Sequence, residues 1–563
     1  MTIHAPTPGE AAPLDHPGFL AGLQFDRGAP ATLKQAARSG SPDAFVQIWL
    51  DDLANRCNSN TPKLPSRAFD WIPTQPHLAS AWRSTATHPQ SRPTIGSNSS
   101  RRSPLPAIAR LETDASDGDL LASLALLCQP PPPKRTQQWL SAWRNCISLT
   151  TTRPLSPELA YITGLLLSPL KGTAALRRSG QRALQEELLD RTDTDGTPHA
   201  DHFDDLPEWL ATLVRAGYWA QRFDNRPWNK LAHQRFSRLV NWLTPLYRHR
   251  DRLALPHRPA RSLQELLNSA IQLAEPAPAS RVTQSDWAHV AVLRTHPMAK
   301  APTVVVTHDR ATPRLDISVD GRTLLDGDWS IKVTGNQHDW TFDHWECVCW
   351  QSDEDADYIE LQAEAGDGRR VDRQILLSRA EELLVLADAV VGHPQSAGDD
   401  PINCHSSLML PDRVTAKPAS NGRRDWRLAG GGVSARVFPL ALPDNPMLAT
   451  GPSTIASHQN QLSWSHAGPG PGLYLPLVVD LSAGRRRRKA EWNSLTVSED
   501  RQVVSPRDAA AFRLKLGDVQ LVLYRSLTNT HPPRSVVGQH VNNETLIGLF
   551  GPDGDIAPLV TVE

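Results

Sequence analysis

Histidine and tyrosine are side-chain types that transfer protons in enzymes, and this chain has 20 histidines and six tyrosines. His199 and His202 follow the dipeptide Asp195-Gly196, which predicts a turn, and His249 stands between arginines. A neutral imidazole is a general base near pH 7, and it must reach a substrate proton while another group serves as the acid. We therefore expect those three histidines to be candidates for an acid–base site.

Two arginines and one aspartate near these histidines are candidates for binding a substrate. Arg248 and Arg250 flank His249, and Asp195 opens the turn. A guanidinium holds carboxylate and sulfate groups through charge-assisted hydrogen bonds. The basic run Arg485–Lys489 could hold such groups as well, although a surface loop between strands is the commoner explanation.

The histidines also have ordinary explanations. Asp201, Asp204 and Asp205 surround His199 and His202, so the two could be solvated loop residues or helix N-caps. The arginines around His249 fit a solvated helix C-terminus. Both explanations stay open at the level of sequence.

No metal site and no cofactor are expected. The six cysteines are scattered, and Cys347-x-Cys349 has the period of a strand without a full set of nearby ligands. The acidic run Ser352–Asp357 lacks the glycine and spacing of a calcium loop. Phosphate-binding loops, dinucleotide-binding glycine motifs, zinc helices and the G-x-S-x-G elbow are absent from the sequence.

The apolar pattern changes its period near residue 280. Before this point, apolar residues recur at helical spacing, as in the stripe Ala232, Phe236, Leu239, Val240, Leu243 and Tyr247. After it they alternate, as in Leu315–Val319, which runs into an Asp320-Gly321 turn and a second apolar run. A second hairpin is predicted around Gly517-Asp518. Helices followed by strands predict two separately packed parts instead of a βαβ sheet.

Three regions follow from this pattern. Residues 1–104 show little periodicity and are expected to be irregular, residues 105–275 to be α-helical, and residues 285–563 to form an antiparallel β-sandwich. With a formal net charge of −1, the chain lacks the basic field of a nucleic-acid binder. Its 17 tryptophans suit stacking on sugar rings, and they suit the bracing of cores equally well.

Four segments, taken in order, resemble the heparinase II/III-like polysaccharide lyases. They are Leu184–His199 with its Asp195-Gly196 turn, Arg238–Ala254 with Arg248-His249, Trp287–Asp328, and Arg373–Val390. The resemblance covers roughly residues 170–395. It implies an incomplete α/α toroid followed by a β-sandwich, with His199, His202 and His249 of the helices facing a cleft. In that resemblance, His338 or His344 would be the histidine by which the sandwich reaches into the cleft. Tyr218 is the first tyrosine after the Asp195-Gly196 turn, where the family has a tyrosine for proton transfer.

The resemblance also implies β-elimination in a uronate-containing acidic glycan, which makes an acidic polysaccharide the expected partner. Two motif positions differ from the family. Phe203-Asp204-Asp205 stands where the family has a tyrosine, and Ala160–Ser168 lacks the family's Asn-His pair. The alternative is therefore a catalytically silent glycan-binding or structural protein that keeps the lyase architecture.

The N-terminal residues lack the charged and apolar regions of a signal peptide, and no apolar run is long enough to span a membrane. These features predict a cytoplasmic protein, whereas the family resemblance implies a periplasmic or exported one. The sequence does not predict the oligomeric state.

Overall fold

The structure is a computed structural model of the 563-residue chain. It describes residues 15–58, 60–87, 103–249, 252–255, 262–275, 283–297, 300–335, 338–366, 368–392, 401–419, 423–445, 447–448, 453–530 and 532–563. The chain forms two compact units. The helical unit comprises Met1–Gly196, Asp205–Asn241 and Pro259–Ala279, and the β unit comprises Thr197–Asp204, Trp242–Arg258 and Ser280–Glu563.

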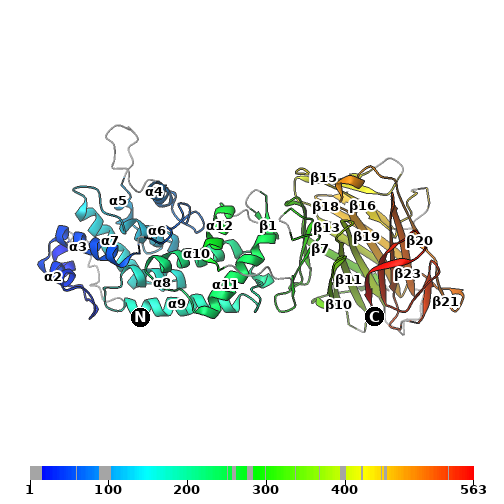
Figure 1. The fold of residues 1–563 in the computed structure, drawn as a ribbon, viewed down its shortest axis with the longest axis horizontal. Helices are drawn as coiled ribbons and strands as arrows, with labels where there is room; N and C mark the ends of the chain where they lie inside the picture. Colours follow the sequence, from blue (N-terminus) through cyan, green and yellow to red (C-terminus); the bar gives the residue numbers. More distant parts are fainter. Residues whose placement is uncertain are drawn as a thin grey trace. The chain divides into compact units, whose positions relative to one another are not determined.

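The helical unit is built from twelve helices in the described residues (Figure 1). They are α1 (His16–Ala21), α2 (Ala31–Ser39), α3 (Pro42–Arg56), α4 (Pro76–Thr87), α5 (Leu105–Ile108), α6 (Asp117–Leu127), α7 (Thr136–Thr152), α8 (Pro157–Leu166), α9 (Thr173–Asp190), α10 (Leu206–Arg222), α11 (Lys230–Leu243) and α12 (Leu263–Leu273). The first four lie where the sequence predicted an irregular region. Short helices separated by prolines hid their period, but Phe45, Trp49 and Leu53 of α3 are buried. Within the described residues, no helix is long and apolar enough to cross a membrane.

The helical stripes read from the sequence are buried. Ala232, Phe236, Leu239, Val240 and Leu243 of α11 are each at most 2% exposed, so this stripe faces the core. The sixth residue assigned to it was wrong, because the helix ends at Leu243 and Tyr247 lies in the short strand β1 (Tyr247–Arg248). β1 pairs with β2 (Arg252–Leu253).

Two glycines let α8 and α9 pack closely. A Cβ atom on Gly180 would lie 2.5 Å from the backbone nitrogen of Tyr161, and one on Gly164 would lie 2.6 Å from that of Arg177. Backbone atoms cannot yield to such contacts, so side chains at these positions would push the helices apart.

The β unit contains two large sheets. The nine-stranded sheet has the order β17-β18-β13-β7-β6-β5-β4-β3, with β8 paired to β7. Its strands are β3 (Gln284–Ser285), β4 (Val290–Arg294), β5 (Thr303–Thr307), β6 (Arg314–Val319), β7 (Arg322–Gly335), β8 (His338–Asp339), β13 (Pro401–Met409), β17 (Thr454–His458) and β18 (Gln461–Pro469). The eight-stranded sheet has the order β14-β15-β16-β19-β12-β11-β10-β9. Its strands are β9 (Glu346–Ser352), β10 (Ala356–Glu364), β11 (Arg370–Ser378), β12 (Leu383–Val391), β14 (Val414–Pro418), β15 (Trp426–Gly430), β16 (Val433–Pro439) and β19 (Gly472–Asp480).

Two smaller sheets follow in the chain. The five-stranded sheet has the order β20-β23-β24-β27-β28, and the four-stranded sheet has the order β22-β21-β25-β26. Their strands are β20 (Ala490–Leu495), β21 (Val497–Glu499), β22 (Gln502–Val503), β23 (Ala509–Leu516), β24 (Val519–Ser526), β25 (Arg534–Val536), β26 (Gln539–Val541), β27 (Thr545–Phe550) and β28 (Ile556–Val562).

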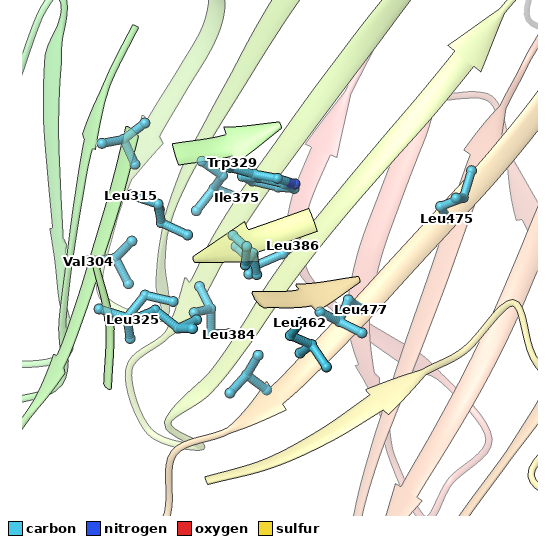
Figure 2. Packing of buried hydrophobic residues seen from close by; sticks show 14 of the residues in the cluster. Val304, Leu315, Leu325, Trp329, Ile375, Leu384, Leu386, Leu462, Leu475 and Leu477 are labelled. Atoms are coloured by element: carbon cyan, nitrogen blue, oxygen red, sulfur yellow. The ribbon is translucent and has the colours of Figure 1, made fainter. Parts of the chain in front are cut away.

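The centre of the eight-stranded sheet is buried on both faces. Leu384 and Leu386 of β12 belong to a core shared with the nine-stranded sheet, which Figure 2 shows with Leu315, Trp329 and Leu462. The alternate residues Leu383 and Val385 belong to a second core shared with the five-stranded sheet. Successive side chains of a strand point to opposite faces, so β12 reads as an unbroken apolar run. The β unit is therefore a sandwich with a third layer.

The predicted hairpins are confirmed. Val319 pairs with Arg322 across Asp320-Gly321, and both turn residues have positive φ (54° and 69°), as a two-residue hairpin turn requires. Leu516 pairs with Val519 across Gly517-Asp518 in the same way.

One ion pair lies fully inside the first core. Arg373 of β11 donates from Nε to Asp388 Oδ1 at 2.8 Å, and its Nη1 donates to the Trp329 carbonyl at 2.6 Å. Ser406 Oγ donates to Asp388 Oδ2 at 2.8 Å and accepts from Trp329 Nε1 at 2.8 Å. Arg373 and Asp388 are 0% exposed, so both charges depend on this network.

Candidate active site

The segment Thr197–Asp204 follows α9 in sequence but packs with the β unit. Gly196, at φ +87°, donates its N–H to the Asp193 carbonyl at 2.9 Å and closes the predicted turn. Beyond it, Ala200 N donates to the Ala288 carbonyl at 2.9 Å. Asp204 accepts from Arg310 at 3.2 Å and from Arg314 at 3.3 Å. These bonds place His199 and His202 beside the start of the β-sandwich.

Five imidazoles, here called the histidine cluster, meet at this point: His199, His202, His289, His308 and His344. The ring of His199 lies 6.1 Å from that of His202 and 5.5 Å from that of His289, measured between centroids. His289 in turn lies 5.0 Å from His308 and 6.2 Å from His344. All five belong to the β unit, including the two that precede it in sequence.

Strand register positions the inner two histidines. β4 and β5 are antiparallel with Val290 opposite Thr307, so His289 and His308, one residue beyond this pair, also face each other. The His308 N–H donates to the His289 carbonyl at 3.1 Å. His289 has a positive φ of 53° in the tight turn that begins at Asp286.

Burial keeps these inner imidazoles neutral near pH 7. Burial, together with the neighbouring histidines His289 and His344 and against a hydrogen bond to the Trp345 carbonyl, lowers the pKa of His308 to about 4. His308 Nδ1 lies 3.1 Å from that carbonyl oxygen, which makes Nδ1 the donor. Burial, followed by the charge of His199, also lowers the pKa of His289. Within the described chain, His308 Nε2 and His289 Nδ1 are buried without a hydrogen-bond partner.

The stability of the protein should fall as the pH drops from about 6.5 to about 4, because the unfolded chain protonates His308 near 6.5 while the folded chain resists until about 4. Between these two pH values the unfolded state binds more protons than the folded state. The stabilisation linked to His308 is therefore complete above pH 6.5 and is lost progressively below it. Its size is about 3 kcal/mol. Denaturant unfolding across this pH range should show that the free energy of unfolding falls less steeply in His308→Gln than in the wild type. Equal slopes in the two proteins would contradict this prediction. His458→Gln, which replaces an exposed histidine, is the control.

Two carboxyl groups and one guanidinium border the histidine cluster. Burial raises the pKa of Asp309, and a hydrogen bond with Asp201 raises it further. Arg310 pairs with two carboxylates, with Nε 3.2 Å from its neighbour Asp309 and Nη2 3.2 Å from Asp204 of the Thr197–Asp204 segment. Its side chain is 45% exposed, so the guanidinium remains accessible to an anionic ligand.

Trp287 is an exposed aromatic ring beside the cluster. It is 47% exposed, which is unusual for tryptophan in this chain, and its ring lies 5.1 Å from that of His199 at an angle of 79°. An exposed flat ring beside polar groups is the arrangement that stacks on the apolar face of a sugar.

The structure brings together three of the six predicted acid–base residues, namely His199, His202 and His344. Tyr218 lies elsewhere, buried in α10 of the helical unit, where its hydroxyl donates to Gln272 at 2.8 Å. His249 is exposed next to β1, and its N–H donates to the Gly321 carbonyl at 2.9 Å. His338 is exposed on β8. Catalytic roles for these residues stay predictions.

The predicted substrate-binding residues are also dispersed. Arg248 is 2% exposed, and its Nη2 donates to Asp316 at 2.6 Å, so its guanidinium is occupied by an internal ion pair. Asp195 is half-buried in the helical unit. Arg250 lies outside the described residues. We include none of the three in the candidate site.

Sequence reasoning missed His289, His308, Trp287, Asp309 and Arg310. One signal was present: a histidine stands immediately before the apolar run of β4 and another immediately after that of β5. Had these runs been paired as an antiparallel hairpin, the two histidines would have fallen opposite each other.

No group of three or more metal-ligating side chains is arranged to hold an ion in the parts of the chain that the structure describes.

Comparison with known proteins decides the fold. No family model and no curated protein matches the sequence. Among solved structures, heparinase III matches with a TM-score of 0.53 at 10% identity, over 90% of this chain and 99% of that one. A mutant of the heparan sulfate lyase HepC from Pedobacter heparinus matches with a TM-score of 0.54, at the same identity and coverage. The chain has the heparinase III fold.

Matching the heparinase III fold along 90% of the chain confirms the predicted architecture, an α/α toroid followed by an antiparallel β-sandwich. A second heparinase III structure agrees, with a TM-score of 0.51 over 88% of this chain and 82% of that one. At 10% identity these likenesses establish the fold and leave the activity to be argued from the site.

Proposed function

We propose that the protein is a polysaccharide lyase that cleaves a uronate-containing acidic glycan by β-elimination. The observation that carries the proposal is the histidine cluster, with an exposed tryptophan and an accessible arginine beside it. The heparinase III fold supports the same class of reaction, because the solved structures that share it include heparinase III and a heparan sulfate lyase.

The reaction needs three functions from the protein. A base removes the proton at the carbon next to the uronate carboxylate, and the electrons of that bond form a carbon–carbon double bond. The bond from the adjacent carbon to the glycosidic oxygen breaks, and this oxygen takes a proton. The carboxylate must be neutralised by a donor, because its charge opposes the carbanion that forms.

Residues of the site suit these functions. His289 is the base in this proposal, since its lowered pKa leaves it unprotonated at neutral pH, and the proton it takes can return to the leaving oxygen. His199 Nδ1 accepts the Asp201 N–H at 3.2 Å, so the ring hydrogen of neutral His199 is on Nε2, where it can donate to the substrate. Arg310 neutralises the carboxylate, and Trp287 supports a sugar ring.

The activity can be tested with a panel of acidic polysaccharides: heparan sulfate, chondroitin sulfate, hyaluronan and alginate. β-Elimination creates an unsaturated uronate, so ultraviolet absorbance should rise with at least one of them. A neutral polysaccharide such as dextran, which has no carboxylate, is the control and should give no rise. No rise on any acidic substrate would overturn the lyase proposal.

One observation favours the second candidate, a silent glycan-binding protein. Phe203, which stands where the resembling family has a tyrosine, is 0% exposed and cannot touch a ligand. Binding of an acidic polysaccharide to the wild type without any gain of absorbance would support this candidate.

A further inference from the structure

A pocket of about 370 Å³ lies within the helical unit, at the C-terminal end of α10. Its walls come from the end of α10, the start of α11, the end of α12 and the loop after α3. The Asn58 N–H donates to the Arg222 carbonyl at 2.7 Å and joins that loop to α10. Since α10 has 17 residues, the pocket lies about 25 Å along this helix from its start at Leu206.

Three asparagines present oriented donors to this pocket. The Oδ1 atoms of Asn58, Asn225 and Asn229 each accept a backbone N–H at 2.9 Å, from Asn60, Arg226 and Ala232. Tyr161 Oη also donates to Asn225 Oδ1, at 3.0 Å. Because each oxygen is occupied, each amide group must present its NH2 as the remaining donor. Among the described residues these NH2 groups have no protein partner.

Charged groups of both signs line the same pocket. Arg226 and Lys230 are exposed and form no ion pair within the described chain, so two positive charges are available to a ligand. Asp224 and Glu275 add two carboxylates, which accept hydrogen bonds from hydroxyl groups.

His233 is held as a donor. Trp228 Nε1 donates to its Nδ1 at 3.0 Å, so the ring hydrogen of neutral His233 is on Nε2. This Nε2 lies 3.5 Å from Glu275 Oε1. Gly217, Ala220 and Leu273 supply an apolar wall.

From this arrangement we propose that the pocket is a second binding site, for an acidic saccharide of one or two rings. The asparagine amides and the two carboxylates can form hydrogen bonds with the hydroxyl groups of a sugar. Arg226 and Lys230 can bind its carboxylate or sulfate group, and the apolar wall can pack against the C–H face of its ring. The volume lies within the range of about 300–1,000 Å³ that is usual for small-ligand sites. The site is separate from the histidine cluster and needs no catalysis, so it goes beyond the proposed lyase function.

Calorimetric titration of the full chain with cellobiouronate and with cellobiose tests this proposal, since the two disaccharides differ by one carboxylate. We expect cellobiouronate to bind the wild type at least about tenfold more tightly than cellobiose, because a charge-assisted hydrogen bond is lost with the carboxylate. The double variant Arg226→Gln with Lys230→Gln removes both free cations. Its affinity for cellobiouronate should fall to about its affinity for cellobiose.

The matched control is Arg38→Gln with Arg178→Gln, which removes two exposed arginines of the helical unit that form no ion pair in the described chain. Its net charge equals that of the pocket variant, and its affinity should equal that of the wild type. The variant His289→Ala should also keep this binding, which separates the pocket from the proposed active site. If the double pocket variant unfolds early, the single variants are measured in its place. No binding to the wild type, no preference for the acid, or an equal loss in the control would overturn the proposal.

Discussion

Replacing His289 by alanine is expected to lower the rate of glycan cleavage by about 10²–10⁴-fold, the usual contribution of a positioned general base. The ring is half-buried among His199, His308 and His344, and the variant removes the imidazole at the centre of the cluster. The measurement is the initial rise of ultraviolet absorbance with the best substrate, at equal folded protein. In the wild type, activity should fall as the pH drops through a value below 6.5, because the pKa of His289 is lowered from that value.

Two further variants make this result specific. His199→Gln keeps a side chain that can accept the Asp201 N–H but loses the ring, so its activity should fall as well, mainly through a raised KM for the acidic substrate. His458→Ala removes an exposed histidine of β17 and should behave as the wild type. If His289→Ala retains full activity while its melting temperature is unchanged, the base lies elsewhere.

The substitution Asp388→Ala is expected to destabilise the protein by about 3–5 kcal/mol, because it leaves the Arg373 guanidinium charged and unpaired in a dry core. Arg373 is 0% exposed, and its guanidinium lies 3.9 Å from the ring centroid of Trp329 and 4.6 Å from that of Trp345, so it has no route to solvent. Scanning calorimetry of the full chain should show the loss in the transition of the β unit.

The double variant Arg373→Met with Asp388→Leu is the control for this prediction. It removes both charges and replaces them with apolar groups, so it should be more stable than the single variant Asp388→Ala. If the double variant is the less stable of the two, the ion pair contributes net stability and the argument from an unpaired charge is wrong.

The sequence was informative wherever one local pattern decided the structure. Asp320-Gly321 between alternating apolar runs predicted its hairpin, and the stripe from Ala232 to Leu243 predicted the buried face of α11. The four N-terminal helices could not be predicted with the same ease, because they begin at or beside prolines and α1 and α2 have only six and nine residues. The sequence could not show which residues of β12 point into which core, because the side chains on both faces of the strand are apolar.

The site was predictable only in part, because it is made by long-range pairing. His199 and His202 were identified from the turn beside them, and their neighbours His289 and His308 come from strands about 90–110 residues later in the chain. Nothing local distinguishes His308 from a histidine at an ordinary strand end; only the β4–β5 register and the bond from Ala200 to Ala288 show where it lies.

The grouping of Thr197–Asp204 with the β unit has a consequence for the order of events during synthesis. The ribosome releases this segment together with the helices, before β4 and β5 have been synthesised. His199 and His202 are therefore without His289 and His308 at that stage. The delay between the synthesis of paired strands is also long in the eight-stranded sheet, where β12 pairs with β19 and Leu383 lies opposite Asp480. Helices built from local contacts fold quickly, whereas sheets built from distant strands fold slowly. A nascent chain therefore carries folded helices while His199 and His202 still lack their neighbours, and the histidine cluster forms only after the strands that carry its other members have left the ribosome.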